Sequence, residues 1–162
     1  MSLKALLKYF YSKSKTIILN EEINKENVNE IVFSNLEGKI IDFFSLDVDG
    51  NDYWVLESLD LKNINVICCE YNHWLGNNTK KAIPYNPEHK FKNDGYFGAS
   101  LLAIHDLLVS KDFRLVAVES SGSNAFFVKN KFSERFEILS PTKSWRSGGR
   151  FDTEADKIRM KQ

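Results

Sequence analysis

Two aspartates, Asp47 and Asp49, stand one residue apart where an apolar run stops at a glycine, in "FFSLDVDGNDYW". A run that ends in this way is typical of a buried strand followed by a turn. Carboxylates are rarely buried without a partner, so the pair needs an explanation. A second polar group, formed by Glu70, Asn72 and His73, follows the next predicted strand. We therefore ask what chemistry these five residues can perform together.

Ligands of open α/β sheets bind outside the carboxyl ends of the strands, and both polar groups lie at such ends, so they can face one crevice. Hard oxygen ligands of this kind suit magnesium or calcium. Clustered carboxylates can also act as a general base, and we name Asp47, Asp49 and His73 as candidate catalytic residues. The alternatives stay open: a turn or a helix cap explains the two aspartates equally well, and His73 can be a loop histidine without a role.

The residue pattern predicts an α/β protein in which strands and helices alternate. The predicted helices are residues 3–13, 24–35, 51–59 and 99–112, and the predicted strands are 16–20, 40–48, 65–70, 113–119 and 124–130. Such alternation favours a mostly parallel sheet with helices on both faces. The two last strands, joined by "SSGS", form a hairpin that adds an antiparallel strand at the end. The nearly all-apolar run 40–48 predicts a strand covered on both faces.

A polar loop, residues 71–98, separates the third predicted strand from the longest predicted helix. Loops of this length in a compact domain are usually functional or disordered. Its aromatic side chains can line an acceptor pocket, or they can pack the loop onto the domain; they are Trp74, Tyr85, Tyr96 and Phe97. Ahead of this loop, either Asn51 or Asp52, which follow the aspartate pair, is a candidate N-cap for the helix predicted at 51–59.

Length and composition bound the class of protein. The 162 residues fit a single domain, of which 132–162 form a polar tail. With 22 basic and 22 acidic residues, global charge gives no argument for binding nucleic acid or an anionic membrane. No apolar run is long enough to span a bilayer. The adjacent cysteines, Cys68 and Cys69, would point to opposite faces of a strand and so would not pair, and we predict a reducing, cytoplasmic setting.

Residues 40–130 resemble the later part of methyltransferases of the FkbM type, a branch of the S-adenosylmethionine-dependent Rossmann-like enzymes. The matching stretches are "FFSLDVDGNDYWVLESL", "VICCEYN", "IPYNP", "YFGASLLAI" and "SGSNAFFVKN". Their order is similar to that family's fourth strand, fifth strand, variable loop, long helix and terminal hairpin. The resemblance implies a Rossmann-like fold in which Asp47 and Asp49 face the methyl donor, S-adenosylmethionine, and the methyl acceptor.

More loosely, the chain is similar to metal-assisted O-methyltransferases. By that resemblance Asp47, Glu70 and Asn72 would bind a divalent cation such as magnesium or calcium, although Tyr71 separates two residues that are adjacent in those enzymes. The implied activity is transfer of a methyl group to a hydroxyl of a small molecule or sugar.

The chain departs from the family ahead of the aspartate pair. The family's glycine-rich turn and its ribose-binding acidic residue are not visible there, and Gly38 is the only glycine that precedes the pair. We expect that the chain begins in the helix after the family's second strand and lacks the cofactor half. Bare sheet edges would then favour self-association. The alternative function is that of a non-catalytic remnant that acts as a binding or assembly partner.

Overall fold

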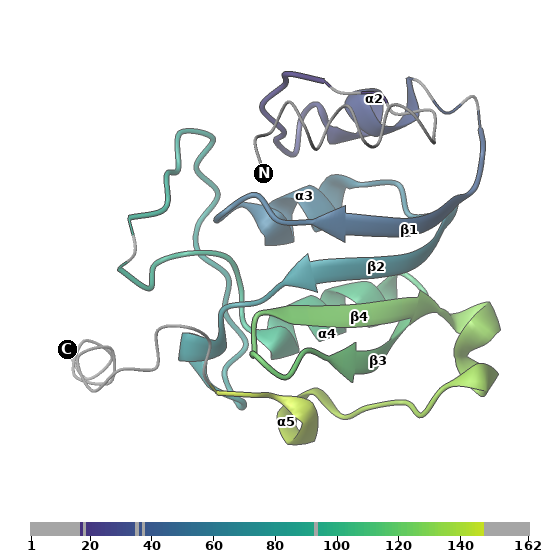
Figure 1. Cartoon of the computed structure of the whole chain (residues 1–162). Coiled ribbons are helices and arrows are strands. Elements are labelled where there is room, and N and C mark those ends of the chain that lie inside the picture. The colour runs from purple at the N-terminus through teal and green to yellow at the C-terminus, as the bar shows by residue number, and fades with distance from the viewer. Residues whose placement is uncertain (1–16, 18, 35, 37, 93, 148–162) are drawn as a thin grey trace, which may run out of the picture.

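The computed structural model describes residues 17, 19–34, 36, 38–92 and 94–147 (Figure 1). The helix predicted at residues 3–13 lies outside these residues. The elements in chain order are α2 (Val28–Phe33), β1 (Ile41–Leu46), α3 (Asp52–Ser58), β2 (Ile64–Glu70), the 3₁₀ turn η1 (His73–Leu75), α4 (Leu101–Ser110), β3 (Phe113–Val118), β4 (Asn124–Lys129), the 3₁₀ segment η2 (Asn130–Arg135) and α5 (Pro141–Ser144).

The described strands form one mixed sheet in the order β1-β2-β4-β3. β1 and β2 are parallel, whereas β4 pairs antiparallel with both β2 and β3, so that β3 runs in the same direction as β2. The α/β class and the final hairpin are confirmed. The sheet is mixed: β1, β2 and β3 run in one direction as expected, but only the β1-β2 pairing is parallel, because the antiparallel strand β4 is inserted between β2 and β3. β4 is the more buried strand of the hairpin, which suits its interior position.

Helices α3 and α4 cover one face of this sheet (Figure 1). Phe44, Ile67, Phe127 and Leu115 are register partners across all four strands and belong to the core under these helices. The helices contribute apolar residues at helical spacing to the same core, among them Val55, Leu56, Ile104 and Leu108. The core therefore lies between α3, α4 and this face of the sheet.

The opposite face of the sheet is exposed at its β1 edge, although Val128 on the same face is buried. Phe43 lies there, in register with Val66, which is in turn in register with Val128, and the Phe43 side chain is 54% exposed. In β1 only Leu46 is buried. The prediction that this strand is covered on both faces is therefore wrong for the described residues, since α3 and α4 both pack on the other face.

Two further expectations are changed by the structure. Ile17 and Leu19 of the strand predicted at 16–20 lie outside the sheet and are about half exposed; residues 16 and 18 are not described. A β-branched run needs a neighbouring strand to pair with, and the described sheet gives it none. The tail from residue 132 is partly docked, because the Leu139 N–H donates to the Leu115 carbonyl at 2.9 Å.

Side-chain hydrogen bonds join α4 to the end of α3 and cap the start of α4. Lys111, which follows α4, donates from Nζ to the carbonyls of Leu56, Glu57 and Leu59 at the end of α3. The hydroxyl of Ser100 caps the start of α4 by accepting the Ala103 N–H. In the part of the chain that the structure describes, no helix has the length and apolarity needed to cross a bilayer.

Candidate functional site

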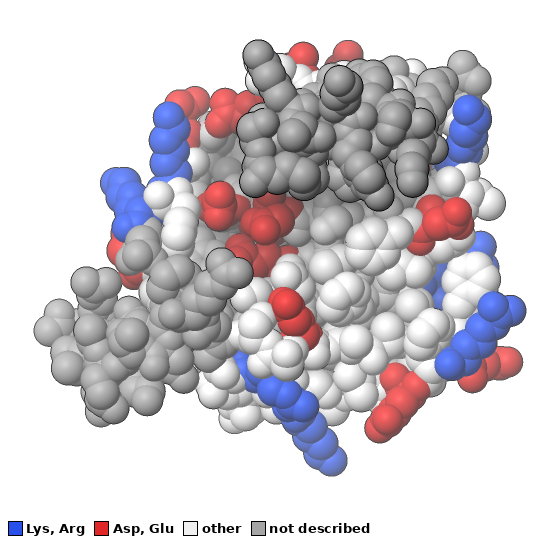
Figure 2. Space-filling view, viewed as in Figure 1, with Lys and Arg blue, Asp and Glu red and all other residues white. Residues whose placement is uncertain are grey.

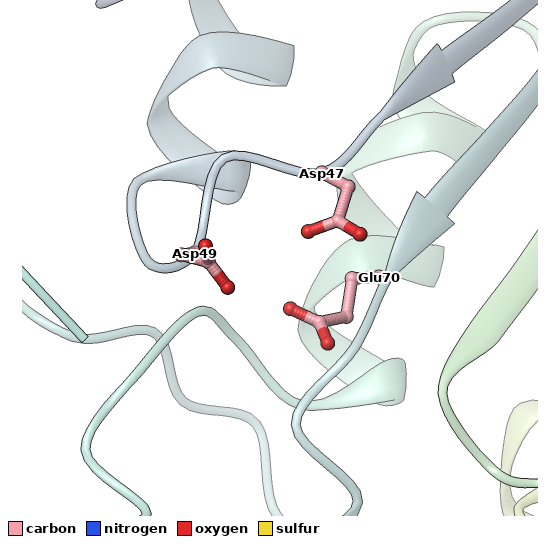
Figure 3. A group of neighbouring side chains, drawn as sticks. All are labelled: Asp47, Asp49 and Glu70. Carbon is pink, nitrogen blue, oxygen red and sulfur yellow. The ribbon is translucent and has the colours of Figure 1, made fainter. Parts of the chain in front are cut away.

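Three carboxylates meet at the carboxyl ends of the parallel pair of strands. Asp47 and Asp49 lie in the link between β1 and α3, and Glu70 is the last residue of β2. One carboxylate oxygen from each residue lies within 4.8 Å of the other two. Figure 3 shows the three carboxyl groups directed toward a common space. We call Asp47, Asp49 and Glu70 the carboxylate triad.

A fourth carboxylate, Asp52, shapes the turn that carries the two aspartates of the triad. Its side chain is 1% exposed and accepts the backbone N–H groups of Val48 and Gly50, each at 3.0 Å. Of the two predicted N-cap residues, Asn51 and Asp52, Asn51 occupies the N-cap position, but its side chain makes no capping hydrogen bond and instead donates from Nδ2 to the Asn86 carbonyl at 2.8 Å. The turn is thus held by a buried carboxylate that follows it in the chain.

The backbone of this turn adopts conformations that most residues avoid. Asp49 has φ = 51°, in the left-handed region, which aspartate tolerates better than most residues other than glycine. Gly50 has φ = 153°, and a Cβ at this position would overlap the imidazole ring of His89. Gly50 is therefore required both by its conformation and by the close approach of the long loop.

The triad concentrates negative charge. Asp47 and Asp49 are exposed and Glu70 is half-buried. Burial, together with the charges of Asp47, Asp52 and Asp49, raises the pKa of Glu70 to about 8. The folded chain therefore favours the protonated form of Glu70 more strongly than the unfolded chain does. Burial also raises the pKa of Asp52, although the N–H groups of Val48 and Gly50 oppose that shift.

No basic side chain neutralises this charge among the ion pairs of the described residues, which join Lys62 to Asp60, Lys80 to Asp106 and His105 to Asp106. In Figure 2 acidic side chains gather near the ends of β1 and β2, beside a surface with mainly uncharged side chains. Acidic groups that crowd together in this way repel one another and attract cations.

The predicted metal ligand Asn72 has a different environment from the triad. Its side chain is 1% exposed. Its amide nitrogen donates to the carbonyls of Gly95 and Phe97, both at 2.9 Å, and its amide oxygen accepts the Trp74 N–H at 3.0 Å. These contacts tie the two ends of the long loop together. A metal-binding role for Asn72 stays a prediction, and its described contacts are structural.

The predicted catalytic residue His73 begins η1, directly after Asn72. It is partly buried, and its ring packs edge-on against Trp74 with 5.8 Å between centroids. The described groups of side chains close enough to share a metal ion include the triad but not His73. Its catalytic role stays a prediction.

The long loop is fastened over the turn at several points. Trp54 Nε1 donates to the Ile83 carbonyl at 2.8 Å, and the Gly98 N–H donates to the Gly50 carbonyl at 3.0 Å. Tyr85 donates its hydroxyl to Glu26, while Lys25 Nζ lies 4.1 Å from the centre of the Tyr85 ring. This loop is therefore an ordered cover that contacts α3 and the segment before α2.

Most aromatic side chains of this loop pack on one another. Phe97 is buried and contacts Trp74 and Phe91, with ring centroids at 6.3 and 5.3 Å. Tyr96 is 54% exposed, and its ring lies 6.1 Å from that of His89. These contacts favour the packing role over an acceptor pocket for Trp74 and Phe97, and leave Tyr96 accessible.

Sequence reasoning gave Asp52 no part beyond a possible helix cap and gave His89 no role. A carboxylate two residues after a glycine at a strand-to-helix turn was the available signal for Asp52. His89 carried no local signal, because it lies far from Gly50 in the sequence and approaches it only in the folded chain.

Comparisons of this chain with family models, with curated proteins and with solved structures find no match. The geometry of the triad is therefore the basis on which a function can be inferred.

Proposed function

We propose that this chain carries the acceptor side of a Rossmann-like, S-adenosylmethionine-dependent O-methyltransferase site. The observation that carries the proposal is the convergence of Asp47, Asp49 and Glu70 at the carboxyl ends of two parallel strands. This is the place where open α/β sheets bind their ligands. The acceptor class that suits three carboxylates is a small molecule or sugar with neighbouring hydroxyls, which donate hydrogen bonds to carboxylate oxygens.

The strand order supports this assignment. Two parallel strands are followed by a long helix and a hairpin, and the second hairpin strand runs antiparallel between its neighbours. The same succession underlies the resemblance of residues 40–130 to the later part of the family's sheet. The resemblance concerns the order of the elements and the positions of the motifs. The proposed chemistry depends on Asp47, Asp49 and Glu70.

The donor set of the triad fits a hard divalent cation, since all three side chains offer carboxylate oxygens that lie close together. Asp47, Asp49 and Glu70 would hold magnesium or calcium. In this ligand set Asp49 replaces Asn72, the third ligand that the resemblance implies. Bound there, the ion would supply Lewis-acid activation that eases deprotonation of the acceptor hydroxyl.

The chain's own residues can also orient the acceptor when no metal ion occupies the triad. Asp47 and Asp49 are exposed, so their oxygens can accept hydrogen bonds from an acceptor hydroxyl. In that metal-free state the raised pKa of Glu70, about 8, would let its ionised form take up the acceptor proton near neutral pH. The buried Asp52 and the covering loop keep the turn in place while this occurs.

The described residues do not fit the methyl donor. A glycine-rich strand-turn-helix that would let the backbone approach S-adenosylmethionine is absent from them, and only Asp47 and Asp49 remain as candidate contacts to the cofactor. The donor side of the site would be formed by residues other than those described.

The exposed β1 edge of the sheet favours the second candidate function, that of an assembly partner. Phe43 is more than half exposed in the middle of β1, and apolar strand faces of this kind are usually covered. A second copy of this chain would present the same face, so a symmetric pair could bury both. This function does not require the triad.

Calorimetric titration with magnesium and with calcium tests the proposed site. Wild type, Asp47→Asn and Glu70→Gln are compared with Asp60→Asn, which removes an exposed carboxylate at the distant end of α3. We expect binding by wild type and by Asp60→Asn, and affinity at least ten-fold weaker in the two triad variants. Equal affinity in all four proteins, or no binding by wild type at millimolar ion, would contradict a cation-binding acceptor site.

A further inference from the structure

We propose that Asp52 is a positioning residue for the carboxylate triad. Its buried carboxylate accepts the N–H groups of Val48 and Gly50, the residues on either side of Asp49. One side chain therefore clamps the backbone both before and after a triad residue. The two hydrogen bonds are contacts in the structure. The expected effect of Asp52 on cation affinity depends on the proposed function.

The conformation of Asp49 explains why a clamp is needed. A left-handed φ of 51° is unfavourable for a residue with a side chain, so an unrestrained turn would move toward ordinary conformations and carry the Asp49 carboxylate away from Glu70. Hydrogen bonds from backbone N–H groups to a carboxylate are among the stronger ones in proteins. The two accepted by Asp52 oppose that relaxation.

The contacts also distinguish this role from a helix cap. An N-cap side chain accepts N–H groups of the first turn of its own helix. The two hydrogen bonds that the Asp52 carboxylate accepts from other residues come instead from the turn that precedes α3. The Trp54 and Val55 N–H groups of the first turn are satisfied by the Asn51 carbonyl. Asp52 thus serves the triad-bearing turn.

The long loop supports the same turn from the other side. The Gly98 N–H donates to the Gly50 carbonyl, and the His89 ring occupies the space that a Cβ at Gly50 would need. Gly50 is consequently held by Asp52 through its N–H and by the loop through its carbonyl. Loss of Asp52 should loosen the turn without detaching the loop, because Trp54 and Asn51 still bind the loop.

The test compares Asp52→Asn and Asp52→Ala with wild type and with Asp60→Asn. Asp60 is a matched control, since its carboxylate accepts the Lys62 N–H in an exposed turn. Amide hydrogen exchange, followed by NMR without metal, reports on Val48 and Gly50, with Ile67 in β2 as the reference for global opening. Calcium affinity is measured by calorimetry on the same proteins.

We expect Asp52→Asn to speed exchange at Val48 or Gly50 at least ten-fold with Ile67 unchanged, and to weaken calcium binding about ten-fold although the triad is intact. Unchanged exchange, or equal acceleration at Ile67 and Gly50, would overturn the proposal. Failure of both Asp52 variants to fold would also overturn it, by making Asp52 a general stability residue. If wild type binds no calcium, the proposed function fails, and exchange still decides whether Asp52 holds the turn.

Discussion

Replacing Glu70 with glutamine should remove a pH-dependent loss of stability. Glu70 has its pKa raised from 4.5 to about 8 in the folded chain, first by burial and then by the charges of Asp47, Asp52 and Asp49. A carboxyl group with a raised folded-state pKa stabilises the protein fully below its unfolded value. That contribution is lost as the pH rises from 4.5 through 8, because the folded state must give up a proton that it binds more tightly.

The magnitude follows from the size of this shift. At about 1.4 kcal/mol per pKa unit, ionising Glu70 in the folded chain would cost roughly 5 kcal/mol if the group were shielded from water. Glu70 is only half-buried, and solvent screens its repulsion from the exposed aspartates. We therefore expect wild type to lose roughly 2 kcal/mol relative to Glu70→Gln between pH 5 and pH 9.

Urea unfolding in metal-free buffer at intervals from pH 5 to pH 9 measures this difference. Glu134→Gln, at an exposed position in η2, is the control and should follow wild type at every pH. Glu70→Gln should match wild type near pH 5 and become the more stable protein above pH 8. Parallel stability profiles for wild type and Glu70→Gln over the whole range would refute the account of the triad as a set of mutually repelling carboxylates.

Four other outcomes are expected. Asp47→Asn should be neutral or stabilising in metal-free buffer and should lose the rise in melting temperature that calcium gives wild type; clear destabilisation without a calcium effect in wild type would mark the pair as a turn. The chain should bind S-adenosylmethionine weakly or not at all, which a micromolar dissociation constant by calorimetry would contradict. It should self-associate in light scattering, and Phe43→Ser should shift it toward monomer; monomeric wild type at high concentration would exclude this. Gly50→Ala should lower the melting temperature by several degrees, because its Cβ would overlap His89, and an unchanged melting temperature would contradict the packing described.

Local pattern was enough to predict most of the elements. The strands and helices from Val28 to Lys129 follow from apolar periodicity and turn residues, which act over a few positions and do not depend on distant partners. The hairpin at 113–130 was predicted for the same reason. The meeting of Asp47, Asp49 and Glu70 was predicted too, because adjacent parallel strands bring their carboxyl ends to one edge.

Only the tertiary structure decided which strands are neighbours. The insertion of β4 between β2 and β3 depends on pairings between residues far apart in the chain, such as Cys68 with Phe126. The exposure of Phe43 likewise depends on the face of the sheet on which α3 and α4 pack. The apolar sequence of residues 40–48 does not indicate which face that is. An apolar side chain predicts burial only where another element arrives to cover it.

For the polar side chains, too, the sequence determined their positions along the elements, and the tertiary structure determined their contacts. The sequence by itself determined that acidic residues would stand at two strand ends, since position along a strand is a local property. The structure decided that Asp52 holds the turn, that Asn72 binds carbonyls 23 and 25 residues away, and that His89 packs on Gly50. It also decided the pKa of Glu70, because burial and neighbouring charge exist only once the chain has folded.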